Sequence, residues 1–479
     1  MGALTKKSSM DLTTGNLYKK IIFFSFPIML AGLLQLLYTQ ANLVTIRIWG
    51  EGDSSVSAIG INGSLITLVI GLFTGLALGA NVVMAHAKGR NDAAYAKKVL
   101  HSSIILSIIF GISVSIFGVA LARYFLIWMN ATDDIIDKAT TYLSIYFLGM
   151  PFTMIYNYGA ALQRALGDSK KPLYSLMISA VINIILNIIF VVVLKLDVAG
   201  AAIATISSEA IAATMTMYWL IKDKNGFVKF SFKDFKLDKE AALEVIRIGL
   251  PAGLESIIFS IANVTIQAES NLFGISSELG NSAASNIEAY LYAVMSAFSQ
   301  AAAAFVAQNY GALKKDNIKK VLKISIILEV SVSLALGALM TTFLDPMLHI
   351  FISSDSQAME IGRSRLYMIL LTYFTCGIMD CYSAFYRSEK YTIVPMIVTL
   401  LGCNIVRMAF IFGLYKLPQF HTLMWLYATF PISWVLSSLI YFILYFFIQP
   451  KVDRKIDDQL AHQNQGGNPE FVTKYANKK

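Results

Sequence analysis

Long apolar stretches, separated by short polar segments, run along almost the whole chain. Each stretch reaches the roughly 20 residues that an α-helix needs to cross a bilayer core. None shows the strict alternation of a membrane β-strand. Because backbone groups in lipid must be hydrogen-bonded within the segment, the stretches are predicted to be helices. Twelve spans are predicted, approximately over residues 20–43, 57–84, 99–122, 139–163, 172–194, 199–221, 245–273, 282–308, 321–345, 364–386, 392–415 and 423–448.

The second half of the chain repeats landmarks of the first at a nearly constant offset. Gly89 and Gly311 are each followed, after the same interval, by Lys-Lys-Val-Leu. Pro27 and Pro251 occupy matching places in the first and seventh spans, where each is predicted to kink its helix and to serve as a hinge. Because each half holds six spans, both halves enter the membrane in the same orientation. Such parallel repeats typically enclose a pathway that opens alternately to each side.

The repeat predicts four regions. An N-lobe over residues 1–221 and a C-lobe over 245–448 each contain six spans. A basic cytoplasmic linker over 222–244 joins them. The polar tail, 449–479, is expected to be disordered.

Composition supports the membrane assignment. Of 479 residues, 56% are hydrophobic and 14% are charged, whereas soluble domains carry about 25% charged residues. Most of the 39 Lys and Arg fall in the N-terminus, in every second loop and in the C-terminus. Since positive charge gathers on the cytoplasmic side, both termini are expected in the cytoplasm, with the chain in the plasma membrane. The net charge of +9 therefore indicates topology, and nucleic acid is excluded as a partner.

Four stretches resemble the multidrug and toxic compound extrusion (MATE) family across nearly the whole chain. They are "GLFTGLALGAN" from Gly71, "LQRALGDSKKPLYSLMISAVINIILN" from Leu162, "GLPAGLESIIFSIANVTIQ" from Gly249, and "NIEAYLYAVMSAFSQAAAAFVAQNYGA" from Asn286. The resemblance implies an all-α membrane protein with twelve helices in two pseudo-symmetric lobes around a central cleft. It also implies an alternating-access exporter of organic cations or other amphiphiles, driven by entry of H⁺ or Na⁺, with no further cofactor.

The N-lobe departs from the family pattern at two acids. Where the first span of many members reads Asn-Leu-Val-Asp, this chain reads from Asn42 to Thr45 without the Asp. Asn183 and Asn187 lie in the fifth span, where some members have Asn followed by Asp, and Thr205 matches a polar position of the sixth. These five residues are expected to form a polar N-lobe site that can coordinate a cation or form hydrogen bonds. Thr45 and Asn187, which stand where family members have Asp, cannot bind and release a proton.

Ionisable side chains inside spans are costly, which makes them functional candidates. Glu209 is the clear intramembrane acid of the N-lobe, although a structural interhelical contact is an alternative. Glu255, Glu288 and Asp380 fall in the C-lobe, and together with Glu209 they are the candidates for cation or proton coupling. One branch of the family uses acids in the same spans as Glu255 and Asp380. Arg407 is expected to be a counter-ion for one acid, with a fixed structural pair as an equal alternative.

Other positions carry weaker signals. Glu269 is expected near the outer end of its span, and Glu329 lies in an apolar run without close polar neighbours. Tyr146 matches a fourth-span aromatic of the family and is expected in the substrate pathway. The three cysteines show no metal-ligand spacing, and no metal site is predicted.

There are two alternatives to an exporter. A flippase for lipid-linked saccharides could use the same scaffold, but it would favour several cationic residues in its cavity, and away from their ends the predicted spans supply only Arg407. An enzyme is not predicted, because the chain has no Walker-type loop and no His-Glu-x-x-His motif. The expected partners are small amphiphilic or cationic substrates and the lipid bilayer, with the protein itself a monomer.

Overall fold

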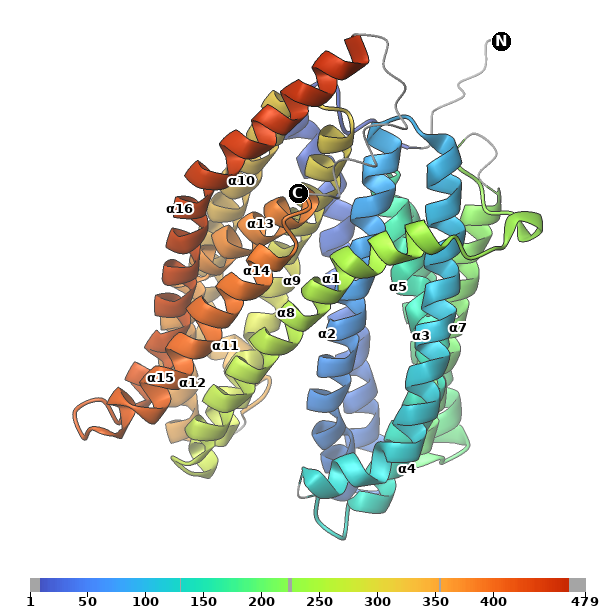
Figure 1. Cartoon of the computed structure of the whole chain (residues 1–479). Coiled ribbons are helices and arrows are strands. Elements are labelled where there is room, and N and C mark those ends of the chain that lie inside the picture. Colours follow the sequence, from blue (N-terminus) through green and yellow to red (C-terminus); the bar gives the residue numbers. More distant parts are fainter. Residues whose placement is uncertain (1–8, 130, 223–225, 353–354, 465–479) are drawn as a thin grey trace.

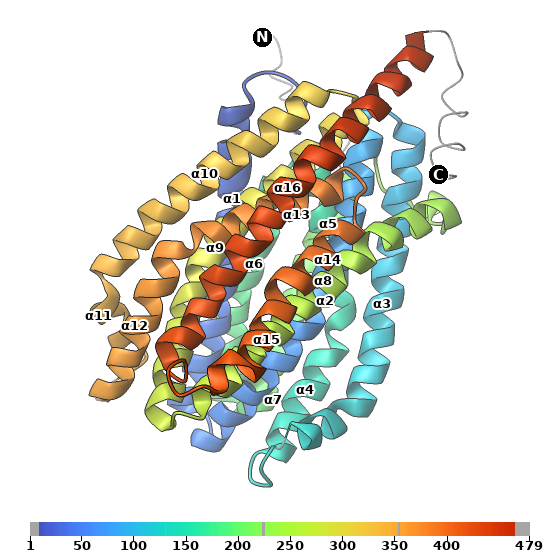
Figure 2. The ribbon, with the colours of Figure 1, turned by 60° about the vertical axis from the view of Figure 1, so that its left-hand side comes forward.

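A computed structural model of the chain describes residues 9–129, 131–222, 226–352 and 355–464. Within these ranges the chain is almost entirely helical and contains no strand. Figure 1 shows two groups of helices, with the first half of the chain (blue to green) on one side and the second half (lime to red) on the other. The start of α1 and the end of α16 lie at the same end of the molecule, here called the terminal side (Figure 2).

The N-lobe consists of seven α-helices and one π-helical segment. They are α1 (Leu17–Trp49), α2 (Asp53–Gly89), α3 (Ala93–Trp128), α4 (Ile136–Leu148), α5 (Met150–Ala165), α6 (Lys170–Asn187), η1 (Ile188–Val193) and α7 (Asp197–Lys222).

The C-lobe repeats this arrangement with more interruptions, after a short 3₁₀ turn, η2 (Phe232–Asp234). Its elements are α8 (Lys239–Asn271), α9 (Ile275–Gly311), α10 (Lys315–Thr342), α11 (Leu344–His349), α12 (Ser356–Thr372), α13 (Phe374–Ser388), α14 (Ile393–Val398), η3 (Thr399–Ile405), α15 (Val406–Phe412), η4 (Leu414–Lys416) and α16 (Leu423–Asn464).

Two of the twelve predicted spans are broken helices. Ten segments of the described chain are long and apolar enough to cross a membrane, and α12 with α13 makes an eleventh, bent by 48°. The predicted span 139–163 is divided between α4 and α5, which meet at Gly149. Pro151, in the first turn of α5, has no backbone N–H to continue the hydrogen bonding of α4. The protein is therefore a multi-pass membrane protein whose fourth and tenth spans are interrupted.

The linker is shorter and the tail is more ordered than the sequence predicts. The helix α8 already begins at Lys239, inside the expected linker, where the side chain of Asp238 accepts a hydrogen bond from the N–H of Ala241. The expected disorder beyond residue 448 is wrong up to Asn464, because α16 continues to that residue. Its polar end is held against α10 by ion pairs, among them one between Lys315 and Asp457 at 2.6 Å. The remaining residues of the tail, 465–479, lie outside the described chain.

The first turns of α1 and α8 cross into the opposite lobe. Leu17, Ile21 and Phe24 of α1 are buried in the apolar core of the C-lobe, and the ring of Phe24 meets that of Phe305 edge-on at 5.5 Å. Val245 of α8 is in turn buried in the core of the N-lobe, together with neighbours in the same turns. The two lobes therefore exchange helix ends in a reciprocal way at the terminal side.

The two predicted hinge prolines lie directly beyond these crossings. Pro27 and Pro251 are both inside their helices, which continue past them. Because Pro251 has no N–H, the carbonyl of Arg247 loses its helical donor, and it accepts a long hydrogen bond from Thr392 Oγ1 at 3.5 Å. The threonine hydroxyl thus replaces the missing backbone donor.

Glycines bring the two lobes into direct backbone contact between α2 and α8. Gly75 and Gly79 of α2 face Gly253 and Gly249 of α8 so closely that a Cβ on any of them would overlap backbone atoms of the other helix. Small residues at four-residue spacing allow such backbone contact in lipid. These four glycines therefore allow the close packing of α2 against α8.

A second glycine contact and the N-terminal segment close the terminal side. Gly89 at the end of α2 and Gly311 at the end of α9 each leave no room for a Cβ against the other helix. On the same side, the N–H of Met10 donates to Gly167 O of the N-lobe at 2.9 Å. Two residues later, Leu12 is fully buried in the C-lobe core, and its carbonyl accepts from Asn309 at 3.0 Å.

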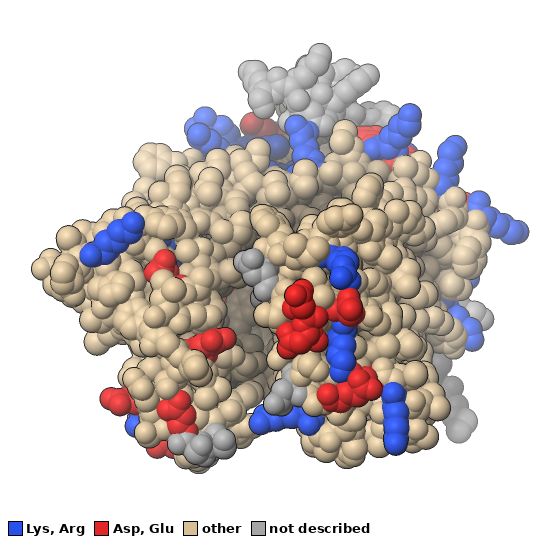
Figure 3. Space-filling model, turned by 90° about the horizontal axis from the view of Figure 1, so that it is seen from below, with Lys and Arg blue, Asp and Glu red and all other residues tan. Residues whose placement is uncertain are grey.

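At the opposite side the lobes separate. Gly60, three helical turns before Gly71, shares the face of α2 that packs on α8 further along. A Cβ at Gly60 would meet nothing within 4 Å, whereas at Gly71 it would already contact Ser256. Figure 3, which views the molecule from this side, shows a hollow between the two lobes. The structure is thus a cleft closed at the terminal side and open at the other.

Candidate functional site

The richest polar site of the C-lobe surrounds Glu255, one helical turn after Pro251. Its carboxylate accepts from Arg387 Nη2 at 2.7 Å and from Ser383 Oγ at 2.7 Å, both on α13. Thr399 Oγ1 donates to it at 3.3 Å from the π-helical segment η3. Interruptions of this kind often accompany functional sites, because they redirect side chains within a helix. Three different helical elements thus converge on one carboxylate.

Asp380 stands beside this group without a basic partner. It lies on α13 next to Glu255 and to Tyr292 of α9, and its side chain is half-buried. Arg387 is the cation of the group and already pairs with Glu255. Among the described residues, no Lys, Arg or His comes within ion-pair distance of Asp380. The group Glu255, Asp380 and Arg387, here called the C-lobe acidic site, therefore has two carboxyl groups and one fixed cation.

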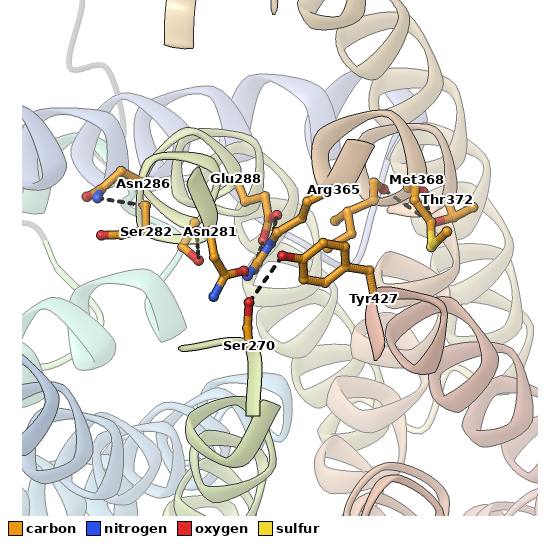
Figure 4. A network of polar contacts seen from close by, with 11 residues as sticks. Ser270, Asn281, Ser282, Asn286, Glu288, Arg365, Met368, Thr372 and Tyr427 are labelled. Carbon is orange, nitrogen blue, oxygen red and sulfur yellow. Dashed lines mark hydrogen bonds and ion pairs between the residues drawn. The ribbon is translucent and has the colours of Figure 1, made fainter. Parts of the chain in front are cut away.

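Glu288 is held in a different way. Figure 4 shows Arg365 of α12 reaching across to Glu288 of α9. Arg365 donates through Nε and Nη2 to the two carboxylate oxygens at 2.7 and 2.8 Å, and its third nitrogen contacts Asn281. Both partners are buried, and the guanidinium also lies 5.5 Å from the ring of Tyr427 on α16. A bidentate pair of this kind is strong and geometrically fixed. Glu288, predicted as a coupling residue, is therefore engaged as an interhelical tie in this conformation.

Arg407 is not a counter-ion for these acids. Its side chain is fully buried and donates to Asn263 Oδ1 at 2.7 Å and to Ser433 Oγ at 2.9 Å. The guanidinium also lies 4.6 Å from the centre of the Phe430 ring, a favourable cation–π distance. None of the ion pairs among the described residues pairs Arg407 with an acid. The predicted pairing is absent here, because the guanidinium is bound by Asn263 and Ser433, while Arg365 and Arg387 pair with Glu288 and Glu255.

Neither arginine stands out in the sequence, because Arg365 is the second residue of the predicted span 364–386 and Arg387 directly follows its end. In the structure each lies within a helix and is nearly inaccessible to solvent. For Arg387 the sequence does hold an indication. It follows Ser383 by four residues, so the two side chains are expected on the same face of one helix. For Arg365 the sequence holds no comparable indication, since its partner is on another helix.

Four of the five residues predicted for the N-lobe polar site are joined by hydrogen bonds. Asn187 donates to Asn42 Oδ1 at 2.6 Å, and Asn42 donates to Thr205 Oγ1 at 3.0 Å. Asn187 also donates to Asn183, one turn earlier in α6. Thr45 does not join them, because its hydroxyl donates to Ala41 O of its own helix at 2.8 Å. The network joins α1, α6 and α7 without a charged group.

Glu209 of α7 lies in a neighbouring aromatic environment. Tyr38 OH donates to Glu209 Oε1 at 3.1 Å, while Oε2 has no hydrogen-bond partner. Tyr146 and Tyr156 are also close to this carboxyl group. Tyr146, predicted in the substrate pathway, is half-buried, and its ring stacks on that of Tyr142 at 6.3 Å. The structure therefore provides an acid surrounded by tyrosines in the N-lobe.

Outside the membrane, the N-terminal segment is fixed by its own charges. Partial burial alone would raise the pKa of Asp11, but hydrogen bonds from Thr14 and Thr13 and the charge of Lys20 lower it to about 2. Lys20 Nζ also donates to Thr14 O at 2.7 Å. No group of three or more His, Cys, Asp or Glu that could hold a metal ion occurs among the described residues.

Two six-span lobes that meet at one side and part at the other, with carboxyl groups inside each lobe, define a membrane transporter. The family model of MatE matches twice, over residues 27–189 and 251–412, which together make up more than half of the chain. The protein therefore belongs to the MatE family, whose members are transporters and not enzymes. The double match also agrees with the internal repeat seen in the sequence.

Similar proteins span nearly the full length. The probable multidrug resistance protein YoeA of Bacillus subtilis is 24% identical over 442 residues, covering 91% of this chain and 95% of the relative. An FAD transporter of Shewanella oneidensis is 23% identical over 359 residues, covering 74% and 78%. Among solved structures, an outward-facing multidrug resistance MATE transporter of the MOP superfamily shares the fold with a TM-score of 0.86, at 22% identity, covering 95% of this chain and 100% of that one.

A further structure has the same fold but a different pocket. A MOP superfamily transporter from Pyrococcus furiosus, described as having a binding pocket of reversed polarity, has a TM-score of 0.86 at 21% identity and covers 94% of this chain and 99% of that one. The fold is therefore shared between proteins with unlike pockets. The choice of substrate must be argued from the side chains of this chain.

Proposed function

We propose that this protein is a secondary active exporter of organic cations and cationic amphiphiles, driven by entry of H⁺ or Na⁺. The observation that carries the proposal is the C-lobe acidic site. Glu255 is neutralised by Arg387, whereas Asp380 brings a second carboxyl group without a second fixed cation. Asp380 can therefore bind one mobile cation, either the driving ion or the substrate.

Coupling follows from competition for that charge. A proton or Na⁺ bound at Asp380 and a cationic substrate bound to the same carboxylate exclude each other. The driving ion and the substrate would favour different states, one with the cleft open at the terminal side and one with it open at the other side. Each therefore shifts the equilibrium between these two states. The prolines after the crossing segments of α1 and α8 lie where those helices would have to bend for the closed side to open.

The orientation follows from charge. Most of the basic residues belong to the termini and to the loops on the terminal side, which supports a cytoplasmic position for that side in a plasma-membrane protein. The cleft described here then opens to the outside. In this conformation the driving ion would enter and the substrate would leave.

Glu209 with its tyrosines provides a second contact for the same class of substrate. Aromatic faces attract organic cations, and a carboxylate adds charge complementarity. Curated relatives carry names of multidrug resistance and export proteins, among them YoeA of Bacillus subtilis and MepA of Staphylococcus aureus. Apolar, aromatic and acidic groups in one cleft suit varied cationic amphiphiles.

Transport by the purified protein in liposomes tests this function. Tetraphenylphosphonium is a suitable cationic probe, and H⁺ and Na⁺ gradients are imposed separately. The proposal expects accumulation against the concentration gradient with one of the two. Failure of both gradients to move the probe would contradict it.

A second candidate is an exporter or flippase for anionic compounds. It is favoured by Arg407, which no acid neutralises, and by one relative that is named an FAD transporter. In the same liposomes, FAD and a lipid-linked pyrophosphate serve as anionic probes. Movement of these, without movement of the cation, would favour the second candidate.

A further inference from the structure

A carboxyl group that the proposed coupling does not use lies inside the C-lobe. Glu329, in the middle of α10, is fully buried between α10 and α13. Cys381 Sγ donates to Glu329 Oε2 at 2.5 Å, while Oε1 has no hydrogen-bond partner. None of the ion pairs among the described residues includes it.

The helix opposite is shaped to receive this side chain. A Cβ on Gly377 of α13 would lie 2.6 Å from Glu329 Oε1, so the absence of a side chain there provides the space for the carboxyl group. Ser325 and Ser333, one turn before and one turn after Glu329, are fully buried as well, and their hydroxyls have no partner. A row of polar groups thus faces the interior of the C-lobe from α10.

An isolated carboxylate cannot remain charged in such surroundings, because burial without a counter-ion forces the group to take up a proton. The titratable groups near Glu329 are Asp380, Cys376 and Cys381 on α13 and Tyr292 on α9. None of them carries a positive charge. Neutralisation must therefore come from a bound proton or a bound metal cation.

The chemistry of the site favours the proton. Na⁺ is a hard cation that prefers several oxygen ligands, whereas the group closest to the carboxylate is a thiol, a soft ligand. The thiol of Cys381 already donates to one carboxylate oxygen, and the other oxygen lies against the backbone of Gly377, which brings no side-chain ligand.

We propose that Glu329 is a proton-binding site behind the C-lobe acidic site, and that it exchanges its proton with the cleft through Asp380. Asp380 is next to Cys381 in sequence and is half-buried. In the exchange one O–H bond breaks at Glu329 and one forms at Asp380, so a proton moves from a neutral acid to a carboxylate without any other change. The part of this proposal that concerns transport rests on the proposed function. It identifies the coupling ion in the C-lobe as H⁺.

Infrared spectroscopy of the full-length protein tests the site directly, since a protonated carboxyl group has its own carbonyl stretching band. At neutral pH we expect such a band in the wild type and its loss in Glu329→Gln. The matched control is Glu278→Gln, an exposed glutamate in the first turn of α9, which leaves the band unchanged. A wild-type spectrum whose band does not respond to Glu329→Gln would overturn the proposal.

Transfer to D₂O tests the route. The band of Glu329 shifts as its proton is replaced by deuterium, and Asp380→Asn is expected to slow this shift by about tenfold or more. Equal rates in the variant and in the wild type would overturn the role of Asp380. Gly377→Ala, which displaces the carboxyl group, is expected to alter the band without removing the acid.

Transport separates this proposal from the proposed function. If no gradient drives export by the wild type while the infrared results stand, the proposed function fails and the proton site remains. If the wild type is driven by H⁺ and Glu329→Gln is driven equally well, the proposed function remains and the coupling role of Glu329 is overturned.

Discussion

A methyl group at Gly311 should open the terminal side of the cleft. In Gly311→Ala, the new Cβ would lie 2.9 Å from the Cα of His86 on α2, and backbone atoms cannot move away as a flexible side chain can. Overpacking of this kind costs about 1–3 kcal/mol. Taking about 2 kcal/mol, the ratio of open to closed terminal sides should rise by roughly 30-fold. The contact belongs only to the closed arrangement, so the open one does not bear this cost.

Labelling of a buried cysteine measures that ratio. Ala307 of α9 is fully buried among N-lobe side chains, so a maleimide reaches Ala307→Cys only when the terminal side opens. The native cysteines are all buried and give the background. Gly311→Ala should raise the labelling rate by roughly 30-fold. The control, Gly60→Ala, adds the same methyl group in open space and should leave the rate unchanged. Equal rates in both variants would show that the Gly311 contact does not hold the cleft closed.

Three further predictions concern other contacts. Glu288→Gln leaves Arg365 buried without its partner and should destabilise the protein by about 3–5 kcal/mol, seen as a lower melting temperature, whereas replacing both residues by leucine should recover much of the loss. Leu12→Ala truncates a buried side chain of the N-terminal segment, which costs about 2–5 kcal/mol of stabilisation, and it should raise the labelling rate at Ala307→Cys. An unchanged labelling rate would show that the segment does not hold the lobes together. Glu209→Gln should weaken binding of tetraphenylphosphonium by about tenfold, and Tyr38→Phe, which keeps the acid, should weaken it less. Equal binding by Glu209→Gln and the wild type would exclude this acid from the substrate site.

The fold could be predicted from the sequence because its main cause is the bilayer. Apolar stretches of sufficient length must be helices, and the repeat gives their grouping into lobes. What the pattern could not give is where helices are interrupted or extended. The break at Gly149 depends on Pro151, and the extension of α16 to Asn464 depends on ion pairs with α10, such as Lys315 with Asp457. The exchange of the first turns of α1 and α8 between lobes leaves hydropathy unchanged, so it has no signal in the sequence.

The candidate site was predicted in its acids but not in their partners. Glu255 and Asp380 were recognisable as costly residues within spans. Their difference arises from Arg387, which neutralises Glu255 and leaves Asp380 without a basic partner. The isolation of Glu329 is likewise a property of the packing between α10 and α13, since the sequence shows only an acid in an apolar run.

The central claim is that the driving ion and the substrate compete for Asp380. It is tested most directly by gradient-driven accumulation of tetraphenylphosphonium in liposomes containing either the wild type or Asp380→Asn, with Glu278→Gln as the control. If they compete, Asp380→Asn loses accumulation by about tenfold or more under the gradient that drives the wild type, while the control retains it. Accumulation by Asp380→Asn at the wild-type level would show that the two do not compete for this carboxyl group.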